Sequence, residues 1–402
     1  MITILSVLFA CGEPEKTTDY DAYCNQDSEG TLIADDADCD GVLTVDDCDD
    51  NDPETINDMD CDGVTTADDC DDADPNSTAV ADDADCDDVI TDLDCDDTNP
   101  RILWTGVDGN CDGYQDTAVI ASGYNHTCAV VSDGTVECWG ASSLDQSDVP
   151  DTTFSQISTG YVHTCGLTTD GSVECWGVTD GGNFDSGQVS NVPEGTFTQV
   201  TSGDFHSCAI QTDRSVVCWG SDEDGQSTAP EGEFLQVSAG GNHTCGIRND
   251  GYPGSGSIAC WGRDTGGQLN VPDSNIAFVQ VTSGASHSCA LETDGTVSCW
   301  GANSAGQSMP PDQDESRYLA ISAGGNFTCG ITTDILEDSR IGQLECWGEN
   351  DEGQLNVSSS RFLQVSAGNG YVTGVTYEGT VECWGFSNPQ GNCEPPEGLS
   401  VF

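Results

Sequence analysis

Three short stretches near the N-terminus place oxygen ligands at the spacing of a Ca²⁺-binding loop. In the first stretch, counting Asp36 as position 1 puts Asp38 at position 3, Asp40 at 5, Thr44 at 9 and Asp47 at 12. Hard oxygen donors at alternating positions suit Ca²⁺, whereas Zn²⁺ and copper sites use imidazole or thiolate ligands. The sequence therefore predicts Ca²⁺ as a structural cofactor of this region.

A second and a third copy repeat this schedule, and a fourth copy is partial. Their predicted ligands are Asp58, Asp60, Asp62, Thr66 and Asp69, then Asp83, Asp85, Asp87, Thr91 and Asp94, and last Asp108, Asn110 and Asp112. In the third copy Asp88 replaces the turn glycine, so a weaker site is expected because this position favours a positive φ. The alternative interpretation is a disordered acidic spacer whose carboxylates only keep it solvated.

Cysteines occur at regular positions in these acidic copies. Each of the three full copies has two cysteines nine residues apart, and spacing alone leaves open whether they bridge within a loop or between neighbouring loops. The pairs of positions are Cys39 and Cys48, Cys61 and Cys70, and Cys86 and Cys95. The helices of an EF-hand are missing, and the arrangement over residues 31–117 resembles thrombospondin type 3 repeats and the aspartate-rich metal-binding repeats of bacterial surface proteins.

Charge and cysteine content exclude several classes of protein. The 402 residues include 72 Asp+Glu and only 8 Lys+Arg, which gives a net charge of −64. Nucleic-acid phosphates would be repelled by this charge, so no nucleic-acid partner is expected. Lys16 is the only lysine, which rules out a phosphate-loop lysine and Schiff-base chemistry. The 23 cysteines indicate an oxidising compartment, and therefore export.

An apolar run over residues 2–10 ends at Cys11 and is about half as long as a membrane-spanning helix needs to be. Leu8-Phe9-Ala10-Cys11 resembles the lipobox of a bacterial lipoprotein signal. The resemblance implies a signal peptide over residues 1–10, lipidation of Cys11 and a tether over residues 11–30. Membrane contact is then expected only through the lipid anchor, at the outer membrane or cell surface. The alternative is an ordinary secretory signal or a disordered N-terminus.

From residue 118 to residue 402 one unit of short β-prone runs and glycine-rich turns occurs seven times. Each unit ends in Cys-Trp-Gly, and the period of about 40 residues is typical of propeller blades. The tryptophans of these triplets are Trp139, Trp176, Trp219, Trp261, Trp300, Trp347 and Trp384. The sequence therefore predicts an all-β fold, a seven-bladed β-propeller that follows an acidic region with little regular secondary structure.

The unit that begins Phe234-Leu-Gln-Val-Ser-Ala-Gly and continues to His243-Thr-Cys245 is similar to the repeat of the regulator of chromosome condensation family. The resemblance implies a closed ring. The first unit lacks the Pro-Glu-Gly opening of other units, and Pro396-Glu397-Gly398 is expected to supply it. This scaffold hosts exchange factors, inhibitors and binding modules, so the nuclear exchange activity of the founding member is not carried over to an exported chain.

Hairpin geometry predicts a disulfide within each of the first six units, because the two cysteines lie opposite each other across a turn. Arg214 stands where other turns have glycine, which predicts local strain. The longer turns Asn249–Ser257 and Asp334–Gly342 predict a bulge or offset at two pairs. The predicted pairs are Cys128–Cys138, Cys165–Cys175, Cys208–Cys218, Cys245–Cys260, Cys289–Cys299, Cys329–Cys346 and, because Thr373 replaces a cysteine in the last unit, Cys383–Cys393.

No nucleophile, base and oxyanion site assemble in the sequence, so no catalytic residue is predicted. The five histidines share one position of the unit, where aromatic residues stand in the last two units, and this favours packing over a ring of metal-binding imidazoles. They are His126, His163, His206, His243 and His287, and the aromatic residues are Phe327 and Tyr371. The loop Val178–Val189 is expected on the face opposite the two longer turns, and loops on a rigid scaffold often bind partners. Neutral variation in loop length is the alternative.

The expected function is that of a non-enzymatic bacterial surface lipoprotein. Its acidic region would form a Ca²⁺-stabilised stalk, and its propeller would bind a protein or glycan partner. Alternatives are a secreted enzyme inhibitor, a hydrolase built on the propeller, or a structural envelope protein.

Overall fold

The computed structural model describes residues 119–251, 255–274, 276–311, 317–332, 342–376, 378–396, 398–399 and 401. Cys11, the stalk cysteines and every predicted Ca²⁺ ligand lie outside these residues. Within the described part of the chain, no helix is long and apolar enough to cross a membrane.

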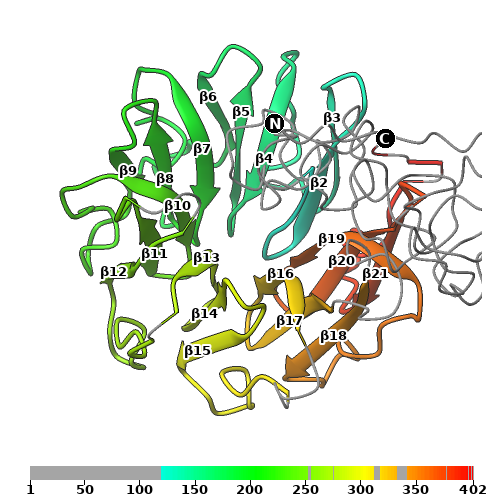
Figure 1. The fold of residues 1–402 in the computed structure, drawn as a ribbon. Helices are drawn as coiled ribbons and strands as arrows, with labels where there is room; N and C mark the ends of the chain where they lie inside the picture. The colour runs from blue at the N-terminus through cyan, green and yellow to red at the C-terminus, as the bar shows by residue number, and fades with distance from the viewer. Residues whose placement is uncertain are drawn as a thin grey trace, which may run out of the picture. The chain divides into compact units, whose positions relative to one another are not determined.

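The described chain consists of β-strands that come in sets of three (Figure 1). The first strands of the sets are β1 (Ile120–Ser122), β4 (Phe154–Thr159), β7 (Phe197–Ser202), β10 (Phe234–Ala239), β13 (Phe278–Ser283), β16 (Tyr318–Ala323) and β19 (Arg361–Ala367). The second strands are β2 (His126–Val130), β5 (His163–Thr168), β8 (His206–Gln211), β11 (His243–Arg248), β14 (His287–Glu292), β17 (Phe327–Thr332) and β20 (Tyr371–Thr376). The third strands are β3 (Val136–Gly140), β6 (Val173–Gly177), β9 (Val216–Gly220), β12 (Ile258–Gly262), β15 (Val297–Gly301), β18 (Gly342–Gly348) and β21 (Val381–Gly385).

The strands of each set pair antiparallel in chain order, which confirms the predicted all-β repeat fold. Five sets form separate three-stranded sheets, whereas the last two sets join into one six-stranded sheet. The junction in that larger sheet is short, because β18 pairs with β19 only through Gly342 opposite Phe362 and Gln343 opposite Arg361.

Seven disulfides stabilise the sets, and each joins two cysteines that the sequence pairs. The expectation of a bulge or offset at the two longer turns is wrong. Cys245 lies directly opposite Cys260, and Cys329 lies directly opposite Cys346. Direct pairing is possible with an even number of turn residues as well as an odd number, so the longer turns leave the strand register intact.

Apolar side chains pack between successive sets rather than within one. Val136 and Cys138 of β3 in the first set pack in one cluster with Phe154, Ile157 and Trp176 of the second set. Cysteine and valine of a third strand thus face the next set while its tryptophan faces the previous one, as strand alternation predicts. The core is therefore divided among the joints between neighbouring sheets.

Glutamine side chains add polar contacts to several of these joints. The Gln156 amide donates to the Val200 carbonyl at 3.1 Å and accepts the Val200 N–H at 2.9 Å. Gln280 makes the same two bonds to Ile321. The side chain therefore continues the backbone pairing across a joint where two first strands lie side by side.

Residues near the end of the chain hydrogen-bond to the first set. The Ile120 N–H donates to Gln364 Oε1 at 3.2 Å, and the Ser122 N–H donates to Ser366 Oγ at 2.8 Å. Val401, which is 3% exposed, donates its N–H to the Gly379 carbonyl at 3.2 Å. Other first strands begin with a bond of this kind to the preceding hairpin, so the segment at Val401 stands in for the missing start of β1.

Arg214 takes a left-handed backbone conformation, with φ 68°, where the equivalent hairpins have Gly134, Gly171 and Gly295. An L-residue with a side chain pays about 1 kcal/mol for this conformation, whereas glycine does not. Arg214→Gly is therefore expected to raise the free energy of unfolding by about 1 kcal/mol in urea denaturation. The reverse change, Gly295→Arg, should lower it, and a less stable Arg214→Gly protein would contradict the expectation.

Candidate binding site on the inner-loop face

Seven three-residue loops connect the first strand to the second strand in each set, and we call the edge that they form the inner-loop face. These loops are residues 123–125, 160–162, 203–205, 240–242, 284–286, 324–326 and 368–370. Because the strands are antiparallel, the segments that follow the third strands emerge at this same edge, and the hairpins between second and third strands lie at the opposite edge.

A chain of backbone hydrogen bonds joins these loops from one set to the next. Each loop begins with glycine, and a Cβ on Gly160 would collide with the Gly203 carbonyl. The residue after the glycine donates its N–H to the next set in most loops. These bonds are Tyr124 to Gly160 (3.2 Å), Tyr161 to Asp204 (3.4 Å), Gly241 to Gly284 (3.2 Å), Ala285 to Gly324 (3.1 Å), Gly325 to Gly368 (3.1 Å) and Asn369 to Gly123 (3.2 Å). The side chains at this position are therefore held at fixed points of the inner-loop face.

Four aromatic rings cluster on one side of this face. The ring centroids of Tyr124 and Tyr161 are 4.1 Å apart, and those of Tyr161 and Phe205 are 5.3 Å apart. Phe184 stacks at 5.9 Å on Tyr161 and at 6.2 Å on Phe205 while remaining 44% exposed. A large apolar side chain with this exposure is available for contact with a partner.

The loop that carries Phe184 follows β6 and is held by its own polar side chains. Asp185 accepts the Gly181 N–H at 2.9 Å, and Gln188 donates to the Phe184 carbonyl at 2.7 Å. The loop starts beside the inner loop of its own set, where the Val178 N–H donates to Val162. The described part of the longer turn Asn249–Ser257 joins β11 to β12 at the opposite edge, so the predicted separation of these two loops is confirmed.

Asp204 lies next to the aromatic cluster. It follows the first glycine of its inner loop, Gly203, and precedes Phe205. Burial raises the pKa of its carboxyl to about 6, and Arg263 opposes this rise. Within the described residues its carboxylate accepts no hydrogen bond. It passes close to Gly241, where a Cβ would lie 3.1 Å from Asp204 Oδ2. Glycine at position 241 therefore leaves room for this carboxylate.

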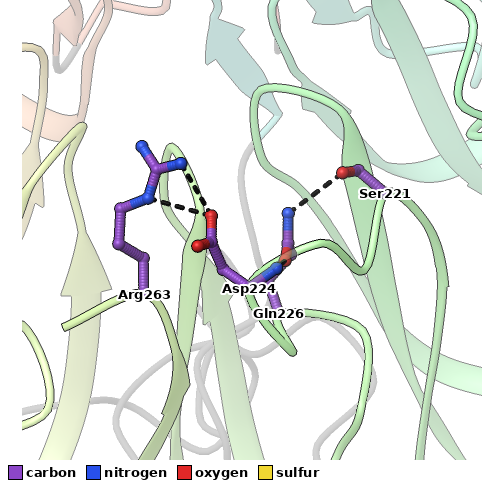
Figure 2. Close-up of polar contacts among 4 residues, drawn as sticks. All are labelled: Ser221, Asp224, Gln226 and Arg263. Atoms are coloured by element: carbon purple, nitrogen blue, oxygen red, sulfur yellow. Dashed lines mark hydrogen bonds and ion pairs between the residues drawn. The ribbon is translucent and has the colours of Figure 1, made fainter.

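Arg263, the cation whose charge acts on this carboxylate, is bound by another acid. Arg263 Nη2 lies 2.7 Å from Asp224 Oδ2, and Nε donates to the same oxygen at 2.9 Å (Figure 2). A turn holds Asp224 in place. The Asp224 N–H donates to Gln226 Oε1, and the Gln226 amide nitrogen donates to Ser221 Oγ at 3.1 Å. Arg263 therefore influences Asp204 through its charge without pairing with it.

The other side of the inner-loop face carries small residues. The second position of the inner loop, which is Tyr124 or Tyr161 on the aromatic side, is occupied here by Gly241, Ala285 and Gly325. The inner-loop face thus has aromatic side chains and the partly buried Asp204 carboxylate on one side, and small side chains on the other. Aromatic faces and a carboxylate can bind a ligand non-covalently, and nothing among them forms a nucleophile with an adjacent base.

The histidines occupy the joints between sets, as the packing interpretation predicts. Each donates or accepts one bond from Nε2 to a threonine or serine hydroxyl of the next set at 2.8 Å. Burial lowers their pKa values to about 4 for His126, His206 and His287, and to about 3 for His163 and His243. Within the described residues no three histidine, cysteine or acidic side chains are grouped to hold a metal ion.

The sequence analysis did not single out the aromatic cluster, Asp204 or the glutamine joints. The glutamines carry a signal in the recurrent Phe-x-Gln-Val/Ile pattern of the units. The cluster carries none of this kind, because Tyr124, Tyr161 and Phe205 occupy variable loop positions. Their proximity follows from the ring of loops, which only the fold reveals.

Comparison with known protein families gives a match over part of the chain. Residues 118–146, 154–188, 197–226, 234–268 and 278–307 match the model of the regulator of chromosome condensation (RCC1) repeat. No curated protein sequence matches the chain.

Several solved structures share the fold. The ectodomain of the receptor kinase CR4 from Physcomitrella patens has 24% identity and a TM-score of 0.55, covering 68% of this chain and 74% of that one. The ectodomain of the Arabidopsis thaliana receptor kinase ACR4 has 24% identity and a TM-score of 0.52, covering 68% and 98%. Prp20p from Saccharomyces cerevisiae has 15% identity and a TM-score of 0.50, covering 62% and 80%. The described part of the chain is therefore an RCC1-like β-propeller repeat protein, with five family-matched repeats between residues 118 and 307.

Proposed function

We propose that this chain is an exported, non-enzymatic binding protein whose inner-loop face binds a partner protein. The observation that carries the proposal is the aromatic cluster in which Phe184 is exposed and stacks on the half-buried rings of Tyr161 and Phe205. Aromatic side chains on a rigid surface supply large contact areas at low conformational cost and are frequent anchors of protein interfaces.

Structural similarity supports a binding role by analogy. Two similar structures are receptor-kinase ectodomains, and the Prp20p structure was described together with its binding to Gsp1p and histones. Their identities are low, so the likeness concerns the scaffold and not the partner. The seven disulfides indicate an oxidising compartment, where thiols persist as disulfides.

The scaffold in this proposal is a closed propeller of seven blades, one for each set of strands. Support for closure comes from the bonds of Gln364 to Ile120 and of Asn369 to Gly123, which join the last set to the first. Val401 supports it further, because it shares a core cluster with Ile120 and Trp139. A closed ring leaves no unpaired sheet at its ends and keeps the inner-loop face rigid.

In the full proposal the N-terminal region is a Ca²⁺-stabilised acidic stalk anchored to a bacterial surface through a lipid on Cys11. Support comes from the repeated carboxylate spacing and the lipobox-like residues before Cys11. Glycan binding, enzyme inhibition, hydrolysis and a purely structural envelope role are the other outcomes that the experiments below can give.

Partner binding is expected to depend on the aromatic cluster. A double variant, Tyr161→Ala with Phe184→Ala, should weaken the binding of a partner identified by crosslinking to the full chain by 30-fold or more, because loss of interface anchors costs about 2 kcal/mol or more. The measurement is the dissociation constant of that partner for the wild-type and variant chains.

The matched control for this experiment is Ile276→Ala. Ile276 is an exposed apolar residue, at 37%, that precedes β13 at the opposite edge of the sets. Its replacement should leave the dissociation constant within twofold of the wild type. Equal affinity of the double variant and the wild type would refute partner binding at the inner-loop face.

The stalk is expected to bind about one Ca²⁺ per intact loop when the full chain is titrated in a calorimeter. Asp38→Asn with Asp40→Asn should remove one site, because carboxylate charge dominates Ca²⁺ affinity in such loops. Asp133→Asn, in a hairpin between β2 and β3, is the control and should leave the number of sites unchanged. No heat of binding at millimolar Ca²⁺ would reject the structural cofactor.

A further inference from the structure

The carboxylate of Asp204 lacks the partners that a desolvated acid normally has. It is partly buried and accepts no hydrogen bond within the described residues. Burial, Tyr124 and, least, the charge of Asp204 raise the pKa of the Tyr161 phenol. Keeping an unpaired charge in such a place is unfavourable, and a bound cation would remove that cost.

Among the described residues, no side chain pairs with this carboxylate. Arg263, whose charge acts on Asp204, has both its Nε and Nη2 directed to Asp224. Breaking that pair to serve Asp204 would leave Asp224 without its partner. The carboxylate of Asp204 is therefore available to an external positive charge.

The groups around Asp204 also favour a cation. Phe205 follows Asp204 in the chain, Tyr161 donates its N–H to the Asp204 carbonyl, and the two rings lie 5.3 Å apart. An aromatic face attracts ammonium and guanidinium groups. The next two inner loops have only the small residues Gly241 and Ala285 at the position of Asp204, so they leave space for a ligand. The net charge of −64 attracts positively charged partners over long distances and repels anionic ones.

The occupant must be larger than a single ion. Phe184 extends the surface beyond the carboxylate and stays 44% exposed, so a ligand that covers it needs an apolar part beside its charge. A lysine or arginine side chain within a polypeptide has such a part in its aliphatic stem and neighbouring residues.

We propose that Asp204 and the rings of Tyr161, Phe205 and Phe184 bind a lysine or arginine side chain of a basic polypeptide. This inference rests on the proposed function and names the chemistry of the partner. The guanidinium or ammonium group contacts the Asp204 carboxylate and the ring faces, and the chain around it covers Phe184.

The test uses the full chain and a hexa-arginine peptide, with a hexa-citrulline peptide as the neutral counterpart. At about 150 mM salt, charges farther apart than about 8 Å are screened, so diffuse attraction to the acidic surface is reduced. Wild-type protein is expected to bind hexa-arginine at one saturable site and to bind hexa-citrulline at least tenfold more weakly. Asp204→Asn should weaken hexa-arginine binding about tenfold.

The matched control is Asp213→Asn, in the hairpin between β8 and β9 of the same set but at the opposite edge. Its amide oxygen can still accept the Ser215 N–H, so the turn should persist. Far-ultraviolet circular dichroism checks that both variants are folded. Hexa-arginine affinity should change less than twofold in the control.

Each result decides between the two proposals. If Asp204→Asn binds hexa-arginine as the wild type does, or if hexa-citrulline or a neutral oligosaccharide binds equally well, the cation inference is overturned. If the crosslinked partner then still depends on Phe184, the proposed function survives without it. If the partner depends on neither Asp204 nor Phe184, both proposals fail.

Discussion

Reduction of the seven disulfides is expected to unfold the described repeats at room temperature. Each in-blade bridge closes a short segment, from the separation of 10 residues at Cys128–Cys138 to the separation of 17 at Cys329–Cys346. Closing loops of this length stabilises a protein by about 3 kcal/mol each in the chain-entropy model. Seven such terms together exceed the about 5–15 kcal/mol that separates most folded domains from their unfolded state.

The measurement is thermal denaturation with and without dithiothreitol, at equal Ca²⁺, followed by circular dichroism and by tryptophan fluorescence. The oxidised protein should unfold at a much higher temperature than the reduced protein. A paired Cys128→Ala, Cys138→Ala variant provides the graded control, with an expected loss of about 3 kcal/mol. A reduced protein with an unchanged melting temperature would show that the packing between the sheets is sufficient.

Acidification from pH 6.5 to pH 5 is expected to lower the free energy of unfolding through the five buried histidines. In the unfolded chain a histidine takes up a proton below about pH 6.5, whereas the buried imidazoles, with pKa values of about 3 to 4, stay neutral. The unfolded state thus binds more protons in this range, so the free energy of unfolding falls as the pH falls. Each histidine contributes about 1.6 kcal/mol of this loss between pH 6.5 and pH 5, and five contribute about 8 kcal/mol.

Asp204 acts in the opposite direction, because burial raises the pKa of its carboxyl to about 6 and it takes up a proton more readily in the folded state, so one variant must isolate a single histidine. His287→Phe reproduces the natural Phe327 of the next set, and Thr328, which bonds to His287, keeps its bond to the Gln307 carbonyl at 3.2 Å. The slope of unfolding free energy against pH should decrease by about 1.4 kcal/mol per pH unit between pH 6 and pH 4.5. An identical slope in the variant and the wild type would contradict the assignment.

The repeat itself made most of the fold predictable. Seven Cys-Trp-Gly triplets fix the third strands, and the cysteine ten residues earlier in most units fixes the second strand opposite them. Even Cys383–Cys393 could be predicted, because Thr373 occupies the usual partner position. The error at the two longer turns came from treating one loop length as a condition for direct pairing.

The candidate site was less predictable because it depends on contacts between units rather than on the unit. Tyr124 and Tyr161 are 37 residues apart by their numbers, and Phe184 lies in an insertion that has no counterpart in other units. These side chains come into contact only because successive sets lie side by side and all inner loops lie at the same edge. The raised pKa of Asp204 likewise results from burial by neighbouring sets, which composition does not encode.

The bond between Ile120 and Gln364 spans 244 positions and has a consequence for biosynthesis. Each disulfide within a unit joins cysteines that are only 10 to 17 residues apart, so the units can be oxidised one at a time as the chain is made. β1, in contrast, must wait for partners that are made more than two hundred residues later. The first unit is therefore the last of the seven to be completed, because its contacts with the last unit form only after the whole repeat region has been made.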